Sequence, residues 1–325
     1  MYFKNKQVLV AGGTGLVGIP LVQLLIEQGA KVRIASRDDK SRAHPDAEFF
    51  QIDLTEDQNC RLVCKGMEYV FNLLCVKGPP GTEKKYPLKI FETMMKLNIN
   101  LASAAFRAGV GGYLYTSSVG VYHPAEILRE DDVWQTQPSK NDWFGGHVKR
   151  AGELQIEAYR IEHGWNTAIV RPSNIYGPYD NFDPDNAMFM PYIIGQFSEG
   201  ISPIITSGDG SQVRDYIHSY DAARGLILAA ENSAGSLNLC SGRETTNREV
   251  IEILQRNTDF KPVIIYDTSR PSGDRRRVLD VSRLKALGFE PKISLEEGII
   301  QTMRWYKENK SKDELRYNIF QSKTR

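Results

Sequence analysis

A glycine-rich turn near the start of the chain constrains the fold more than any other feature of the sequence. Val-Leu-Val at 8–10 precedes three glycines spaced three residues apart, and an apolar stretch follows at 19–28. The two apolar runs suit a buried strand and a helix, and glycine permits the tight turn between them. Such a turn directs backbone N–H groups and the positive end of the helix dipole at one point, which suits a pyrophosphate. The pattern predicts dinucleotide binding, with a purely structural turn as the alternative. The predicted contact residues are Gly12, Thr14, Gly15, Leu16, Val17 and Gly18.

The first half of the chain alternates short apolar strands with longer amphipathic helices. The predicted strands are 7–11, 31–35, 48–52, 68–74, 112–116 and 166–170, and the helices between them are 15–29, 57–65, 87–109 and 146–163. This alternation predicts an α/β fold with a doubly wound, Rossmann-type parallel sheet that carries helices on both faces.

After about residue 175, glycine, proline and aspartate become frequent and the elements shorten. The predicted strands are 203–206, 213–217, 236–240 and 262–266, with helices at 187–198, 218–231, 246–256 and 294–309. We interpret 1–175 as a dinucleotide-binding domain and 176–310 as a smaller α/β substrate lobe interleaved with it. Residues 311–325 are expected to be a polar, loosely held tail. Ligands of such folds bind beyond the carboxyl ends of the strands.

Charge and cysteine content limit the possible partners. The 325 residues carry a formal net charge of +1, which gives no electrostatic argument for nucleic acid or a membrane surface. No apolar run is long enough to span a bilayer, and we expect a cytoplasmic protein. Cys60 and Cys64 lie one helical turn apart without a histidine or a second pair, so no metal site is predicted. Cys75 and Cys240 lie in apolar strand contexts and are expected to be core thiols.

The end of the predicted second strand bears on the choice of cofactor. Sites that prefer NAD usually place an acidic residue there, whereas NADP sites use Arg or Ser for the 2′-phosphate. Ser36 and Arg37 therefore favour NADP over NAD, although Asp38 remains able to reach a ribose. Asp53 follows the third strand and is placed either to bind the adenine amino group or to cap a helix. Leu54 and Leu74 complete the predicted cofactor site.

A serine follows the predicted fifth strand. Tyr115-Thr116-Ser117-Ser118 brings hydroxyl groups to the carboxyl end of a central strand, where they face the cofactor cleft. We expect Ser118 to form a hydrogen bond with a substrate hydroxyl or carbonyl group. The alternative is a serine that only caps a turn.

Motifs along most of the chain resemble those of the extended short-chain dehydrogenase/reductases, the NAD-dependent epimerase/dehydratase family that acts on nucleotide sugars. The resemblance covers residues 7 to about 309, and 178–184 and 280–284 look most like its GDP-L-fucose synthase branch. It rests on the glycine turn, Ser117-Ser118 with Tyr122, and the segments 149–153, 171–178, 208–218 and 287–291.

The resemblance implies roles for individual residues. Lys149 would bind the nicotinamide ribose and lower the pKa of a neighbouring acid. Asn174 would contact the substrate phosphates and Arg214 the pyrophosphate of a nucleotide sugar, a task suited to a guanidinium. Arg270 or Arg275 would add a second phosphate contact. For each arginine the alternative is a surface ion pair, and Lys77 completes the expected substrate site.

The chain departs from the family pattern where a proton must be moved. A tyrosine four residues before the lysine normally acts as acid and base, but here that position is Gly145. The fucose-synthase cysteine and histidine correspond to Gly120 and Met188, neither of which transfers protons. Tyr122 and His147 are the titratable residues nearest in sequence that would replace the tyrosine, with His123 a further candidate. Alternatively, Gly145-Gly146 makes room for a bulky substrate or a water.

The predicted function is hydride transfer between a nucleotide-sugar carbinol and NAD or NADP, of epimerase, dehydratase or C4-oxidase type, with an unusual acid–base group. The alternative is a non-catalytic protein of the same fold that binds a dinucleotide or a sugar nucleotide; a reductase of an unrelated carbonyl is a third possibility. In the family, helices corresponding to 87–109 and 146–163 pair in a homodimer. Their apolar stripes, which burial within one chain would also explain, are Leu97, Leu101, Ala104, Ala105, Leu154, Ile156, Tyr159 and Ile161.

Overall fold

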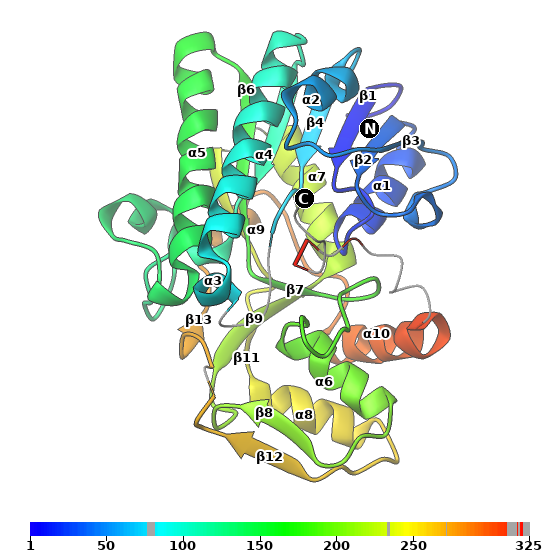
Figure 1. Ribbon diagram of the computed structural model, residues 1–325, viewed down its shortest axis with the longest axis vertical. Coiled ribbons are helices and arrows are strands. Elements are labelled where there is room, and N and C mark those ends of the chain that lie inside the picture. The colour runs from blue at the N-terminus through cyan, green and yellow to red at the C-terminus, as the bar shows by residue number, and fades with distance from the viewer. Residues whose placement is uncertain (77–81, 233–234, 271, 311–316, 318, 321–325) are drawn as a thin grey trace.

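The computed structural model describes residues 1–76, 82–232, 235–270, 272–310, 317 and 319–320. Its main body is a seven-stranded sheet in the order β10-β6-β5-β4-β1-β2-β3, with every neighbouring pair parallel (Figure 1). This confirms the predicted doubly wound sheet. The strands are β1 (Gln7–Ala11), β2 (Lys31–Ser36), β3 (Glu48–Gln51), β4 (Tyr69–Asn72), β5 (Gly112–Thr116), β6 (Asn166–Pro172) and β10 (Gly235–Leu239).

Helices cover both faces of this sheet, because the apolar side chains of its central strands point to both sides. On one face, α1 (Gly18–Glu27) and α7 (Ser219–Asn232) pack in a core that includes Leu21, Leu25 and Leu226. The other face holds α2 (Asp57–Cys64), α4 (Pro87–Arg107) and α5 (Trp143–His163), with Leu101 and Ile156 in its core. A short helix, α3 (Thr82–Lys85), precedes α4.

The second lobe is built on two small sheets. β9 (Val213–His218) pairs with β7 (Asn174–Tyr176), β11 (Glu244–Thr246) and β13 (Arg276–Arg277), while β8 (Ile204–Ser207) pairs with β12 (Ile264–Asp267). Ile194, Leu254 and Ile299 join the three main helices of this lobe in one apolar cluster. These helices are α6 (Phe189–Ser198), α8 (Asn247–Arg256) and α10 (Leu295–Asn309).

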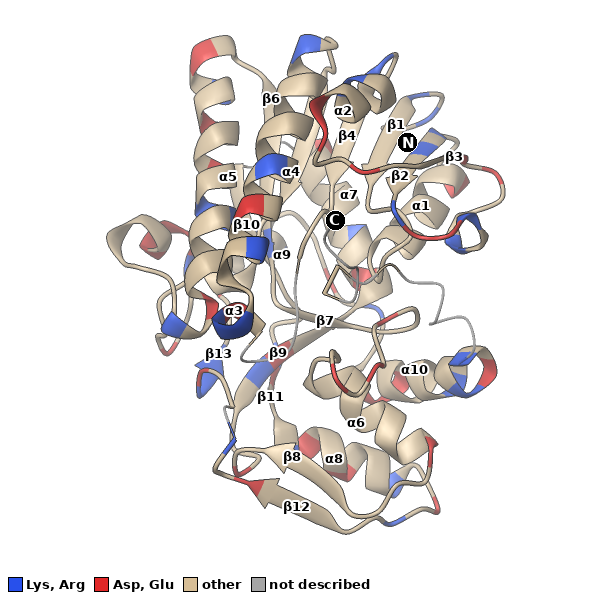
Figure 2. Ribbon diagram, viewed as in Figure 1, with Lys and Arg blue, Asp and Glu red and all other residues tan. Residues whose placement is uncertain are grey.

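The chain passes between the lobes more than once. α7 and β10 follow β9 in sequence, yet both return to the main sheet, where β10 forms its edge beside β6. The short helix α9 (Ser282–Ala286) also packs against β10. Figure 2 shows charges of both signs interspersed on α5, α8 and α10. Among the described helices, none combines the length and apolar character needed to cross a bilayer.

Two details of the sequence analysis need correction. β4 ends at Asn72, before the predicted 74, so Cys75 lies beyond the strand and is exposed rather than a core thiol, whereas Cys240 is buried as predicted. The apolar stripe predicted on α4 is buried within the chain itself: Leu97, Leu101, Ala104 and Ala105 are at most 5% exposed.

Candidate cofactor and substrate cleft

A cleft of about 810 Å³ lies between the lobes, at the carboxyl ends of the central strands. Its size falls within the range of small-molecule sites in proteins. The lobe built on the main sheet contributes the glycine turn, Thr116, Ser118 and, from α5, Lys149. The second lobe contributes residues 180–184 and Met188. The structure thus brings together the predicted turn, serine and lysine.

The glycine turn forms an open cradle for an anion. Gly12 has φ +88°, a conformation that favours glycine. A Cβ on Gly18 would overlap the carbonyl oxygen of Gly12 and come within 2.6 Å of the Cα of Gly13, so α1 approaches the strand too closely for any side chain. The first turn of α1 carries neither an acidic residue nor a side-chain cap. Its N–H groups and dipole therefore suit the pyrophosphate of a dinucleotide. Gly15, Leu16 and Val17 also line the cleft.

Thr14 and Ser36 fix the loop that follows β2. The buried Thr14 hydroxyl lies 2.6 Å from Ser36 Oγ and donates to Asp38 at 2.7 Å. Asp38 also lies 3.8 Å from the buried guanidinium of Arg42. Arg37 lines the cleft, with its guanidinium 3.6 Å from Asp53. Arg37 therefore lines the cleft at the end of β2, while Asp38 is held by Thr14 and Arg42.

The other predicted cofactor residues are placed differently. Asp53 accepts hydrogen bonds from the backbone N–H and the hydroxyl of Thr55, both at 2.9 Å, and it is not among the residues that line the cleft. It does not cap α2 either, because the N-cap residue of that helix is Glu56. Leu54 is 3% exposed and packs in the core under α2, which corrects its assignment to the cofactor site. Leu74 contributes a backbone carbonyl, and Leu73, which the sequence analysis missed, lines the cleft.

Three described residues of the C-terminal tail also border the cleft. The ring of Tyr317 lies 3.9 Å from the Arg37 guanidinium, and its backbone N–H donates to Asp38 at 2.8 Å. Ile319 and Phe320 pack beside Val76 and Ile90. Aromatic and aliphatic side chains thus bring these residues of the predicted polar tail against the body of the protein.

Ser118 and Lys149 face the cleft from neighbouring elements. Ser118 Oγ accepts from Gly120 N–H at 3.1 Å, so this serine caps a short 3-10 helix, η2 (Val119–Val121), and also lines the cleft. Lys149 is 3% exposed, and its Nζ donates to the carbonyls of Thr116 at 2.7 Å and Leu74 at 3.1 Å. The Thr116 hydroxyl has no hydrogen-bond partner among the described residues. A bound ligand can supply a hydrogen bond to that hydroxyl. The sequence alone does not reveal this unpaired hydroxyl, because its burial depends on the fold.

Arg214 of β9 is not among the residues that line the cleft, and its guanidinium contacts backbone carbonyls. Its Nη1 donates to the carbonyls of Val213 at 2.8 Å and Arg275 at 3.5 Å, and no described carboxylate lies within ion-pair distance of it. Burial and the neighbouring Arg277 lower the pKa of Arg214. Arg277 itself pairs with Asp142 and, at 2.6 Å, with Asp274. A guanidinium without its own carboxylate suits an anion from a ligand.

None of the described residues predicted to bind substrate, Arg214 included, lines the cleft. The amide of Asn174 donates to the carbonyl of Asp215 at 3.3 Å. The half-exposed Arg270 pairs with Asp267 at 2.9 Å, which is the surface ion pair of the alternative interpretation. Arg275 is exposed, and only its backbone reaches Arg214. Lys77 lies outside the described residues.

Neither predicted replacement for the tyrosine reaches the cleft. Tyr122 is 3% exposed, donates to Asn238 at 2.5 Å and accepts from Arg171 at 3.2 Å; burial raises its pKa far above the ordinary value. His147 packs edge-on against Trp143, and burial lowers its pKa. On a helix its position lies about 200° around the axis from Lys149, because each residue advances about 100°. The structure therefore contradicts a direct role for either side chain.

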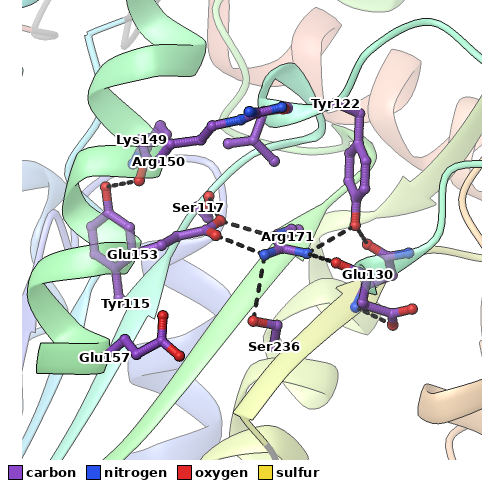
Figure 3. Close-up of polar contacts among 12 residues, drawn as sticks. Tyr115, Ser117, Tyr122, Glu130, Lys149, Arg150, Glu153, Glu157, Arg171 and Ser236 are labelled. Carbon is purple, nitrogen blue, oxygen red and sulfur yellow. Dashed lines mark hydrogen bonds and ion pairs between the residues drawn. The ribbon is translucent and has the colours of Figure 1, made fainter. Parts of the chain in front are cut away.

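A buried ionic network lies behind the cleft and fixes α5 to the sheet (Figure 3). Glu153 of α5 accepts from Arg171 Nε at 2.9 Å and Nη2 at 2.7 Å, and also from the Ser117 hydroxyl. Both partners of the ion pair are 1% exposed. Because all three residues come from different elements, the network fixes the position of α5, and with it Lys149, relative to β5 and β6.

Two adjacent glycines at the start of α5 serve different purposes. A Cβ on Gly146 would overlap the carbonyl oxygen of Gly120 and come within 2.7 Å of Pro138, so close packing requires glycine there. A Cβ on Gly145 would instead lie 2.5 Å from Oε1 of Glu83. The space beside Gly145 therefore holds a carboxylate from α3. The sequence analysis missed Glu83, because no spacing relates it to a residue more than sixty positions away.

Comparisons with known proteins extend over nearly the whole chain. A family model described as the NAD dependent epimerase/dehydratase family matches residues 8–240. GDP-L-fucose synthase 1 of Arabidopsis thaliana is 30% identical over 317 residues, which cover 94% of each chain. The UDP-glucose 4-epimerase of Thermotoga maritima shares the fold with a TM-score of 0.84 at 24% identity, over 93% of this chain and 99% of that one. MoeE5, in complex with UDP-glucose and NAD, has a TM-score of 0.79 at 26% identity, with 93% and 99% covered.

Proposed function

Because the chain belongs to the NAD dependent epimerase/dehydratase family, we propose that it transfers a hydride between a carbinol of a nucleotide sugar and a nicotinamide dinucleotide. The observation that carries this proposal is the convergence of the glycine cradle, Ser118 and Lys149 on one cleft. Relatives named as sugar-nucleotide epimerases, synthases and reductases support the substrate class.

The residues present fit a bound dinucleotide. The N–H groups at the start of α1 would hold its pyrophosphate, and Lys149 would hold the nicotinamide ribose. We propose NADP rather than NAD, since Ser36 and Arg37 offer a hydroxyl and a cation where NAD sites use a carboxylate. When bound, the nicotinamide supplies the hydride acceptor or donor.

The substrate would lie between Ser118 and the second lobe. Ser118 Oγ, already accepting from Gly120, keeps its own proton to donate to a sugar oxygen. Arg214 would bind the pyrophosphate of the substrate, since it has no carboxylate partner among the described residues. These two groups would orient the reacting carbon in a site that the lobes shield from water.

A product assay tests this function. The purified protein would be incubated with NADP⁺ or NAD⁺ and a panel of GDP-, UDP-, CDP- and dTDP-sugars, and the products identified by NMR. Conversion of at least one sugar nucleotide is expected. Absence of conversion across the panel, with both ligands bound, would instead support the alternative function, a non-catalytic protein that binds a dinucleotide or a sugar nucleotide. The placement of Tyr122 and His147 away from the cleft is the observation that favours this alternative.

We also propose a homodimer through the outer faces of α4 and α5. Leu88 and Ile99 of α4 and Leu154 and Ile161 of α5 are exposed apolar residues, and Leu154 is 51% exposed. Two-fold dimers are the commonest oligomers, and such faces suit them. Light scattering after chromatography should give twice the chain mass, and Leu154→Glu should shift the protein towards the monomer. We place the protein in the cytoplasm, where a reducing environment preserves its free thiols.

A further inference from the structure

We propose that Glu83 is the acid–base group of the reaction and replaces the tyrosine that Gly145 cannot supply. This inference rests on the proposed hydride transfer and names a residue of the same site. Gly145 holds the position one helical turn before Lys149, and the structure fills the adjoining space with the Glu83 carboxylate.

Two backbone N–H groups hold the Glu83 carboxylate in place. Its Oε2 accepts from the N–H of Phe144 at 3.0 Å and its Oε1 from that of Gly145 at 3.1 Å, so Glu83 is fixed at the start of α5. A Cβ at position 145 would lie 2.5 Å from Oε1. A side chain at 145 and the Glu83 carboxylate therefore exclude one another in this geometry.

The space beside Gly145 lies on the same face of α5 as Lys149. Residues four apart on a helix differ by about 40° around its axis, so Gly145 and Lys149 share one face of α5. Lys149 points from this face into the cleft, where it donates to the carbonyl of Thr116. The first turn of α5 also packs on the Ser118–Gly120 turn, since Gly146 lies against the carbonyl of Gly120. Glu83 thus lies on the helix face shared with the lysine, at the end of α5 that packs beside the serine.

The surroundings of Glu83 raise the pKa of its carboxyl group. Burial and the charge of Asp142 raise the pKa of Glu83, while its two N–H donors and Arg277 act in the opposite direction. A carboxyl group with a raised pKa can accept and return a proton closer to neutral pH than an ordinary one. Each carboxylate oxygen keeps a lone pair beyond its N–H bond.

The step balances with the oxidised dinucleotide as hydride acceptor. As the C–H bond of the carbinol breaks, its electron pair leaves with the hydride to the nicotinamide. The O–H proton passes to Glu83, directly or through one water, and a carbonyl forms on the sugar. The reverse step returns the proton from Glu83 to the carbonyl oxygen.

Two other titratable side chains line the cleft itself, whereas Glu83 is not among its lining residues and lies beside it at the start of α5. Cys75 is an exposed thiol that lines the cleft, and Asp183 lies on the second lobe. Asp183 already accepts from the Asn186 amide at 2.6 Å and from Asp185 N–H at 3.1 Å. Neither lies at the start of α5 on the face it shares with Lys149, which is why the geometry favours Glu83.

The test compares Glu83→Gln with Glu92→Gln, a matched loss of charge on the exposed face of α4. For each protein, kcat, KM and the melting temperature are measured from acidic to neutral pH. Glu83→Gln should lower kcat about a hundredfold or more and remove the fall in kcat on the acidic side. Its KM should change little, and its melting temperature should fall modestly, because the amide oxygen keeps only one of the two N–H bonds at the start of α5. Glu92→Gln should behave as wild type. A Glu83→Gln protein with the wild-type pH profile and kcat would overturn the proposal.

A second pair of variants reports on the geometry without turnover. Gly145→Tyr should lower the melting temperature, and adding Glu83→Ala should remove most of that loss because the carboxylate no longer fills the space. The double variant should also regain turnover that Glu83→Ala alone lacks. Independent, additive losses would contradict the shared space. A wild-type protein that converts no sugar nucleotide would overturn the proposed function and this inference together, whereas an active wild type with an equally active Glu83→Gln variant would overturn the inference alone.

Discussion

The starts of α1 and α5 both adjoin the cleft but are used in opposite ways. α1 has no acidic residue in its first turn and no side-chain cap, and its glycines keep the approach open. α5 has its first N–H groups bound by the protein's own carboxylate, Glu83. The N-terminus of α1 is thus available to an anion from a ligand, whereas the N-terminus of α5 already binds the Glu83 carboxylate. On the proposed assignment, the dinucleotide-binding half of the site keeps an open helix start, whereas Glu83 occupies the helix start in the proton-transfer half.

The largest expected effect comes from releasing α5 from the sheet. Glu153→Ala leaves Arg171 buried without its carboxylate and should lower the free energy of unfolding by about 3–5 kcal/mol. Glu157→Ala, on the same helix but pairing at the surface with Arg160, should cost at most about 1 kcal/mol. Urea unfolding of the two variants measures the difference. Equal losses would mean that the network does not hold α5.

At the start of a third helix, α7, the side chain of His218 caps a backbone N–H group and can be protonated. His218 Nδ1 accepts from Tyr220 N–H, and burial lowers the pKa of His218 to about 4. The unfolded chain, with a pKa near 6.5, binds the proton first, so acid favours unfolding. Stability should fall by up to about 3 kcal/mol as the pH drops from 7 to below 4.

His218→Gln should flatten this pH dependence in urea titrations, relative to wild type. His163→Gln, a surface substitution at the end of α5, serves as the control. If the two variants lose stability in parallel between pH 7 and 4, His218 does not titrate as a buried neutral cap.

Closing the open cradle of α1 is expected to have an intermediate effect on stability. Gly18→Ala forces a Cβ into the backbone of Gly12 and Gly13, which should cost about 1–3 kcal/mol and abolish dinucleotide binding. Gly195→Ala, in α6, meets its nearest atoms at 4.0 Å and should be neutral or stabilising. Unfolding curves and a fluorescence titration with NADP⁺ measure both effects. Retained binding in Gly18→Ala would show that the close contact is dispensable.

The smallest expected effect concerns the choice of cofactor at α1. Arg37→Ala should weaken NADP⁺ binding about tenfold to a hundredfold, because a charge-assisted contact with a phosphate is worth about 1.5–3 kcal/mol. NAD⁺ binding should change much less. Arg61→Ala, on the exposed surface of α2, is the control. An equal loss for both dinucleotides would indicate that Arg37 does not contact the 2′-phosphate.

The sequence predicted the framework well where the physics is local. Apolar periodicity located the strands of the main sheet and the longer helices of both lobes, and the glycine spacing located the α1 turn. The periodicity missed the short elements α3, α9, β7, β11 and β13. The sequence was less informative about contacts between side chains that lie far apart along the chain. Leu54 and Tyr122 lie beside functional motifs yet pack inward, and Glu83 reaches Gly145 from a separate helix. Such contacts depend on the packing of α3 and α5, which no spacing in the sequence encodes.

A single-turnover measurement shows whether Glu83 takes the proton during hydride transfer. Wild type and Glu83→Gln, each loaded with the oxidised dinucleotide, would be mixed with the sugar nucleotide that the product assay identifies, and the absorbance of the reduced nicotinamide followed over time. The account predicts a transient or lasting rise in wild type and a rise at least about a hundredfold slower in the variant. Equal rates in the two proteins, or no reduced nicotinamide in wild type while both ligands bind, would contradict it.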